Sequence, residues 1–196
     1  MNFPWARHYQ RYEYVMNRGW IDGKRVADFG CGLPAGANAM TVNAKMVYAV
    51  DPLLREFAGV KMGFFSPAGS DAVKRMRILP YDLFLVKKKF DVITAIEVFE
   101  HMPNPKKFVE HVAGHCKNAF LTTPLAERTA RTINSSHVAE YSSDDFDDIV
   151  KGSFTIIEKL YQLGDMSVVK HAKADGCSMD DSHVVQMVWC RSKYGR

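Results

Sequence analysis

The sequence has few cysteines, and none of them has the spacing of a zinc site or of a disulfide framework. The four in its 196 residues are Cys31, Cys116, Cys177 and Cys190. No two of them form a CxxC pair, the commonest signature of metal binding or redox chemistry. Free thiols are therefore expected.

Long apolar runs are also missing. No stretch approaches the roughly 20 residues that a membrane-spanning helix requires. The amino terminus lacks the order of a signal peptide, in which a charged segment precedes an apolar one. We therefore expect a cytoplasmic protein with no membrane contact. The sequence contains no zinc finger, RNA-stacking motif or repeat, and it indicates no oligomeric state.

The composition is that of an ordinary globular protein, with 47% hydrophobic and 24% charged residues in 196. This length predicts one domain over residues 1–196, with residues 1–22 as an N-terminal helical cap. The net charge is +4, and basic residues cluster at 74–77, 87–89 and 191–196. These clusters either contact phosphates of a nucleic acid or nucleotide, or form a solvated surface.

Strand-like and helix-like segments alternate along the chain, which predicts an α/β fold with a parallel sheet. Strands are expected over residues 25–29, 47–51, 76–80, 90–95 and 119–123. Helices are expected over residues 4–19, from about residue 36, and over 105–115. Two further strand-like runs, residues 154–161 and 184–191, suggest an antiparallel pair that closes the sheet.

A glycine turn follows the first of these strands. Residues 26–32 read Val-Ala-Asp-Phe-Gly-Cys-Gly, and Asp51 ends the next strand 19 residues after Gly32. Glycines let the backbone approach a ligand, and a carboxylate accepts hydrogen bonds from ribose hydroxyls. This pattern is typical of a nucleoside site. A dinucleotide-dependent oxidoreductase is an alternative, but it needs a phosphate-binding loop at residues 30–36, where Pro34 replaces a glycine.

Acidic residues follow several of the expected strands. Asp51 ends one, and Asp82 and Glu97 each lie just past the end of another. Because parallel strands share one carboxyl edge, where such sheets bind ligands, these side chains are expected to line one rim.

A second group of polar residues lies just after the strand at 90–95. Glu97, Glu100 and His101 are spaced i, i+3 and i+4, so they share one face if a helix starts there. Two carboxylates and an imidazole that converge would repel one another unless a cation joined them. The oxygen-rich set favours Mg²⁺ or Mn²⁺, and the imidazole favours Mn²⁺ or a softer ion.

Together these segments resemble the class I S-adenosylmethionine-dependent methyltransferases from His8 to Arg191. The residues that carry the resemblance are Tyr9–Glu13, Gly23–Gly32, Val50-Asp51, Tyr81–Leu83, Phe90–Ile93, Glu97–His101, Thr122–Pro124 and His137–Tyr141. The resemblance implies a single-domain Rossmann-like methyltransferase fold. Its sheet would be mostly parallel and seven-stranded, with an antiparallel C-terminal strand and helices on both faces.

The resemblance also implies a cofactor site for S-adenosylmethionine. Asp28, Gly30 and Gly32 would face the methionine moiety, and Asp51 would bind the ribose hydroxyls. Asp82 and Leu83 would hold the adenine. Glu97 would be a further cofactor contact, because the loop after this strand touches the cofactor in methyltransferases of this kind.

The Glu-x-x-Glu-His segment resembles that of two metal-dependent groups, the ubiquinone-pathway O-methyltransferases and the enzymes that 2′-O-methylate small-RNA 3′ ends. By this resemblance Glu97, Glu100, His101 and His137 would bind a metal. Similar segments occur in methyltransferases with no known metal, in which His101 would act as a base or be structural. Glu100 and His101 are accordingly the expected catalytic residues.

We therefore expect a methyltransferase that acts on a hydroxyl of a sugar, a ribose or a phenol, with a small molecule, a glycan or an RNA end as substrate. A non-catalytic module that binds the cofactor is an alternative, in which Glu97, Glu100 and His101 would be dispensable.

Overall fold

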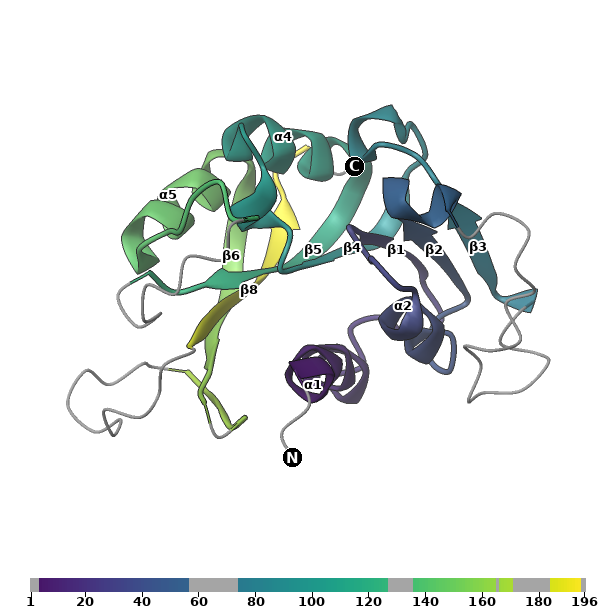
Figure 1. Ribbon diagram of the computed structural model, residues 1–196, viewed down its shortest axis with the longest axis horizontal. Helices are drawn as coiled ribbons and strands as arrows, with labels where there is room; N and C mark the ends of the chain where they lie inside the picture. The colour runs from purple at the N-terminus through teal and green to yellow at the C-terminus, as the bar shows by residue number, and fades with distance from the viewer. Residues whose placement is uncertain (1–3, 57–73, 127–135, 165, 171–183, 195–196) are drawn as a thin grey trace. The chain divides into compact units, whose positions relative to one another are not determined.

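A computed structural model of the chain describes residues 4–56, 74–126, 136–164, 166–170 and 184–194 (Figure 1). The chain divides into two compact units, Met1–Ile96 and Glu97–Arg196. Each unit has its own strands and helices. The expectation that residues 1–196 form a single domain stays a prediction.

The first unit contains a parallel sheet with the strand order β3-β2-β1-β4. Its elements are α1 (Pro4–Asn17), β1 (Arg25–Phe29), α2 (Ala35–Met40), β2 (Met46–Val50), η1 (Pro52–Arg55), β3 (Met76–Leu79), η3 (Leu83–Leu85) and β4 (Phe90–Ile96). The chain runs outward from β1 to β3 and then returns to place β4 on the other side of β1. Sheets of this kind bind ligands where the strand order reverses, outside the carboxyl ends of the strands.

The core of the first unit consists of its strands. Val26, Phe29, Val47, Val92 and Ile93 have no exposed surface. Strands that are covered on both faces need such continuous apolar runs rather than an alternation of apolar and polar residues. The apolar runs of β1, β2 and β4 therefore suit strands that are covered on both faces.

The second unit contains the strand order β5-β8-β6-β7. Its elements are η4 (Phe99–His101), α4 (Pro105–His115), β5 (Cys116–Pro124), α5 (Ser143–Ser153), β6 (Phe154–Gln162), β7 (Val168–Val169) and β8 (Val185–Ser192). The last strand, β8, runs antiparallel to both β5 and β6. The antiparallel pair expected near the carboxyl end of the chain is thereby confirmed.

The α/β class expected from the sequence is confirmed, with parallel strands and an antiparallel C-terminal strand. The described residues contain eight strands rather than the expected seven, because the two-residue β7 pairs with the end of β6. The helix α5 was not expected. Of the segment between β2 and β3, residues 57–73 lie outside the described part of the chain. No helix among the described residues is both long enough and apolar enough to cross a membrane.

Candidate functional site

Asp28 lies near the end of β1 and is fully buried. One carboxylate oxygen accepts a hydrogen bond of 3.0 Å from the Tyr12 hydroxyl, and the other accepts one of 2.6 Å from the Thr94 hydroxyl. Burial raises the pKa of Asp28 to about 7, and the nearby Asp51 charge adds to the rise against the opposing effect of the two hydrogen bonds. Asp28 can therefore change its protonation state near neutral pH.

The loop after β1 needs its glycines. Gly30 and Gly32 have φ of 69° and 52°, a left-handed region that glycine enters without strain. The Gly32 N–H donates a hydrogen bond of 2.9 Å to the Asp51 carboxylate, and the Leu53 N–H donates one of 2.8 Å to its other oxygen. Asp51 therefore ties the glycine loop to the end of β2 and also caps η1.

Gly36 allows two helices to pack closely. A Cβ added there would lie 2.2 Å from the Tyr12 ring, and Gly36 is a residue of α2 with no positive φ. The missing side chain is needed for the close approach of α1 to α2. The Tyr12 ring packs against Gly36, and its hydroxyl donates to Asp28.

Asp82 and Leu83 follow β3, as expected. The exposed Asp82 caps η3, because one of its oxygens accepts a hydrogen bond of 2.9 Å from the Phe84 N–H. Leu83 is buried. Both residues lie shortly after β3, which belongs to the same parallel sheet as β2. The Asp51 N–H, at the end of β2, donates to the Leu79 carbonyl at the end of β3. The first unit therefore carries carboxylates after β2 and after β3, and a buried carboxylate in β1.

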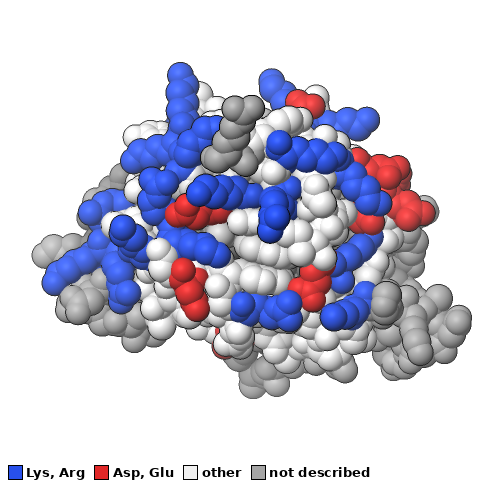
Figure 2. Space-filling model, turned by 180° about the vertical axis from the view of Figure 1, so that it is seen from behind, with Lys and Arg blue, Asp and Glu red and all other residues white. Residues whose placement is uncertain are grey.

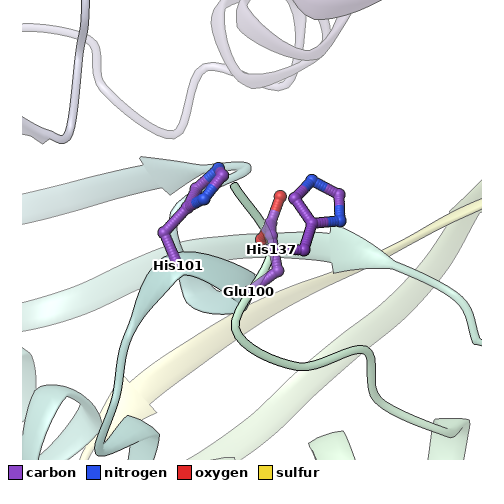
Figure 3. A group of neighbouring side chains, drawn as sticks. All are labelled: Glu100, His101 and His137. Carbon is purple, nitrogen blue, oxygen red and sulfur yellow. The ribbon is translucent and has the colours of Figure 1, made fainter. Parts of the chain in front are cut away.

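In the second unit, three of the four expected metal ligands lie together. Glu100, His101 and His137 each offer one ligand atom, and these atoms all lie within 4.8 Å of one another. Figure 3 shows the three side chains pointing to the same side, two of them from η4 and His137 from a segment beyond β5. Sequence spacing alone could not show that His137 reaches the other two.

Backbone hydrogen bonds bring the His137 segment to η4. The Glu100 carbonyl accepts hydrogen bonds from the N–H groups of Val138, at 2.8 Å, and Ala139, at 3.3 Å. The His101 ring adds a third contact, since its Nδ1 lies 2.8 Å from the Ser136 carbonyl oxygen. A carbonyl only accepts, so Nδ1 carries a proton and donates it to this oxygen. Nε2 is therefore the ring atom of His101 that is left to face a ligand.

Glu100 is fully buried, and its carboxylate accepts a hydrogen bond of 3.1 Å from the Thr123 hydroxyl. Its charge contributes to the raised pKa of Tyr141, of which burial is the larger cause. The Tyr141 ring packs edge-on against Phe99, with ring centroids 4.8 Å apart. A buried carboxylate is stabilised either by protonation or by a bound cation.

Glu97 does not join this group. Its φ is 56°, so the helical turn begins only at Phe99, and the shared helix face expected for Glu97, Glu100 and His101 does not form. Its N–H donates to the Thr122 hydroxyl at 3.0 Å, and its carboxylate lies 3.3 Å from that hydroxyl, which donates to it. β5 therefore positions Glu97 through Thr122 and Glu100 through Thr123.

Comparisons with known proteins give a consistent result. The profile of a family described as a methyltransferase domain matches residues 8–158. A ubiquinone biosynthesis O-methyltransferase of Coxiella burnetii is 26% identical over 113 residues, which are 55% of this chain and 45% of the relative. The match thus spans about half the length of the curated relative.

Solved structures show the same fold. A small-RNA methyltransferase superposes with a TM-score of 0.74 at 16% identity, covering 98% of this chain and 26% of that one. A magnesium protoporphyrin IX methyltransferase of Synechocystis with bound S-adenosylhomocysteine gives 0.68 at 14% identity, covering 95% and 83%. At these identities the likeness speaks for the fold.

Proposed function

The chain belongs to the class I S-adenosylmethionine-dependent methyltransferases, and we propose that it methylates a hydroxyl of a sugar, a ribose or a phenol with the help of a divalent metal ion. The observation that carries this proposal is the grouping of Glu100, His101 and His137. The names of the relatives, a ubiquinone-pathway O-methyltransferase and a small-RNA methyltransferase, set the first acceptors to try.

The cofactor contacts proposed for the first unit are supported by hydrogen-bonding capacity. Each oxygen of Asp51 accepts one backbone N–H and keeps a second lone pair for a ribose hydroxyl. We place the methionine moiety at Asp28, Gly30 and Gly32. The remaining contacts of the proposal are Asp82 and Leu83 toward the adenine and Glu97 as a further cofactor residue.

The donor set fits a divalent transition-metal ion. Two imidazoles and one carboxylate suit Mn²⁺ or Fe²⁺ better than Mg²⁺, which prefers oxygen ligands. Glu100, His101 and His137 would hold the ion, and Glu97 would not be a direct ligand because it lies outside the group. A bound divalent ion lowers the pKa of a hydroxyl that contacts it, so that an oxyanion is available near neutral pH.

The protein's own residues supply orientation. Thr123 and the Ser136 carbonyl fix Glu100 and His101, so that little ordering entropy is lost when a ligand binds. In the transfer, the acceptor oxygen forms a bond to the methyl carbon as the carbon–sulfur bond breaks, and S-adenosylhomocysteine leaves. The hydroxyl proton must also be removed.

His101 offers a metal-free alternative for that proton. Nδ1 faces a carbonyl, so in the neutral ring Nε2 carries the lone pair and could accept the proton directly as a general base.

Titration of the chelator-treated protein with Mn²⁺ tests the proposal. We expect one Mn²⁺ site by calorimetry, its loss in Glu100→Gln and His137→Ala, and retention in His8→Ala, an exposed histidine of the first unit. Affinity for S-adenosylhomocysteine should stay unchanged in all of them. If methyl transfer survives chelation but is abolished by His101→Ala, the reaction needs no metal and His101 acts as the general base. Transfer retained in Glu100→Gln and His101→Ala would show that neither residue is needed.

A further inference from the structure

Basic side chains gather at the amino ends of the strands in the first unit. Each of the four parallel strands is preceded or begun by lysine or arginine, and the nine residues are Lys24, Arg25, Lys45, Lys74, Arg75, Arg77, Lys87, Lys88 and Lys89. We call this set the basic edge. All of its members except the half-buried Lys24 are exposed.

The strand register brings these residues to one edge. Arg25 lies opposite Met46 and next to the β2 amino end, while Val47 lies opposite Met76. Arg77 turns back to the same end, since its guanidinium donates to the carbonyls of Lys74, at 3.2 Å, and Met76, at 3.0 Å. Segments that are separate in the sequence thus form one row, with neighbouring strands about 4.8 Å apart.

Among the described residues, two acids lie beside this charge. Asp91 lies 3.7 Å from Arg25, and Asp22 accepts a hydrogen bond from the Asn43 side chain. The carboxylates Asp51 and Asp82 follow the opposite, carboxyl ends of their strands. Figure 2 shows a face on which Lys and Arg side chains crowd together with few Asp and Glu among them.

The second unit also has basic residues near one kind of strand end. Lys117 and Lys151 come near the starts of β5 and β6, and Arg191 and Lys193 lie at the end of β8, which is antiparallel to both. Arg191 pairs with Asn118 on one side and with Thr155 on the other. The same kind of strand end is therefore basic in both units.

We propose that the basic edge is a docking surface for the phosphate backbone of a single-stranded nucleic acid. A row of exposed cations with few acids attracts phosphates and releases their counterions. Neighbouring strands in a sheet are rotated by about 20–25°, so the row follows a twisted line. A flexible strand can follow this line, whereas a flat lipid surface would meet only part of it. The inference does not depend on the methyl acceptor or on the metal.

Fluorescence anisotropy with a labelled single-stranded RNA of mixed sequence tests the proposal. The edge variant combines Lys45→Gln, Arg75→Gln and Lys87→Gln. The control variant removes the same charge from exposed lysines outside the edge, by Lys106→Gln, Lys107→Gln and Lys170→Gln. Affinity for S-adenosylhomocysteine checks that both variants are folded.

We expect the wild-type chain to bind with a Kd in the micromolar range at low salt. The slope of log K against log salt should become shallower by about 2 in the edge variant, since each lost contact to a single strand removes about 0.7. The Kd of the edge variant should rise about tenfold or more, and that of the control variant less than about threefold. Equal losses in the two variants would overturn the proposal. The proposal would also be overturned if the chain bound vesicles rich in phosphatidylserine through the basic edge but did not bind RNA.

Discussion

Asp28 illustrates what a single residue can add to a motif. The sequence marks it as an acid near a glycine turn, but only the fold shows that it is buried between the Tyr12 and Thr94 hydroxyls. Because its pKa is raised to about 7 in the folded state, that state holds the proton between pH 4 and 7 while the unfolded chain releases it. The free energy of unfolding should therefore fall as pH rises through this window.

Asp28→Asn should remove this part of the pH dependence. Between pH 5 and pH 8 the wild-type chain should lose up to about 3 kcal/mol of unfolding free energy from this group, and the variant should not. Urea unfolding of both proteins at the two pH values measures the difference. Identical pH profiles would show that Asp28 ionises as it does in the unfolded chain.

Thr122 and Thr123 are neighbours on β5 that are both fully buried, and each orients a different glutamate. Thr123→Val removes the hydroxyl that donates to Glu100, whereas Thr122→Val acts on Glu97. If Glu100 is a metal ligand, loss of the hydroxyl that orients it should weaken Mn²⁺ binding by about 10- to 100-fold in Thr123→Val. Calorimetry should show little change of Mn²⁺ affinity in Thr122→Val. A larger loss of affinity in Thr122→Val than in Thr123→Val would indicate that Glu97 is the ligand.

At the scale of elements, the contact between α1 and α2 depends on one missing Cβ. Gly36→Ala places a methyl group 2.2 Å from the Tyr12 ring, and such overpacking costs about 1–3 kcal/mol of unfolding free energy. A Cβ added at the helical Gly114 of α4 would meet nothing within 4 Å, so Gly114→Ala should stabilise by about 0.5–1 kcal/mol. Thermal unfolding of the two variants should thus shift in opposite directions. A shift of the same sign in both would mean that Tyr12 moves aside at no cost.

The helix α5 was missed although the sequence carries its signals. Ser142 precedes it and accepts a hydrogen bond of 3.1 Å from the Asp145 N–H, while the buried Phe146 and Val150 are four residues apart. Ser142→Ala should lower the free energy of unfolding by about 1 kcal/mol, and Ser142→Thr, which keeps the hydroxyl beside the Asp145 carboxylate, should restore the cap. Urea unfolding of the two variants tests this, and equal stability would rule out a capping role.

The helices and strands that were predicted well are those with strong patterns. The apolar runs of β1 and β4 and the proline that starts α4 mark their elements clearly. No helix starts at Glu97, as a shared face with Glu100 and His101 would require, and nothing in the sequence indicates its positive φ. His137 joins Glu100 through backbone hydrogen bonds between distant segments, and residue spacing does not encode such bonds.

At the scale of the whole molecule, the sequence was informative about the cofactor and less so about surfaces. The family could be identified from the order and spacing of several short motifs, among them the glycine loop and Asp51, and the match over residues 8–158 confirms it. The basic edge consists of short clusters whose common position depends on strand register. Residues 74–77 and 87–89 were therefore visible as charge clusters, while their alignment required the fold.

Cofactor binding should stabilise the whole chain through linkage. At a concentration of S-adenosylhomocysteine about 100 times its Kd, the free energy of unfolding should rise by about 2.7 kcal/mol, which is about 5–10 °C in Tm. Asp51→Asn should lose most of this shift, because hydrogen bonds to a charged group contribute about 1.5–3 kcal/mol. Asp91→Asn, at the opposite end of the same sheet, should keep it, since Asp91 pairs with Arg25. The shift produced by the ligand, rather than the Tm without ligand, is the relevant measurement, because Asp51 also caps η1. If the ligand raises the Tm of the wild-type chain and of Asp51→Asn equally, Asp51 does not bind the ribose. The family assignment would not be affected.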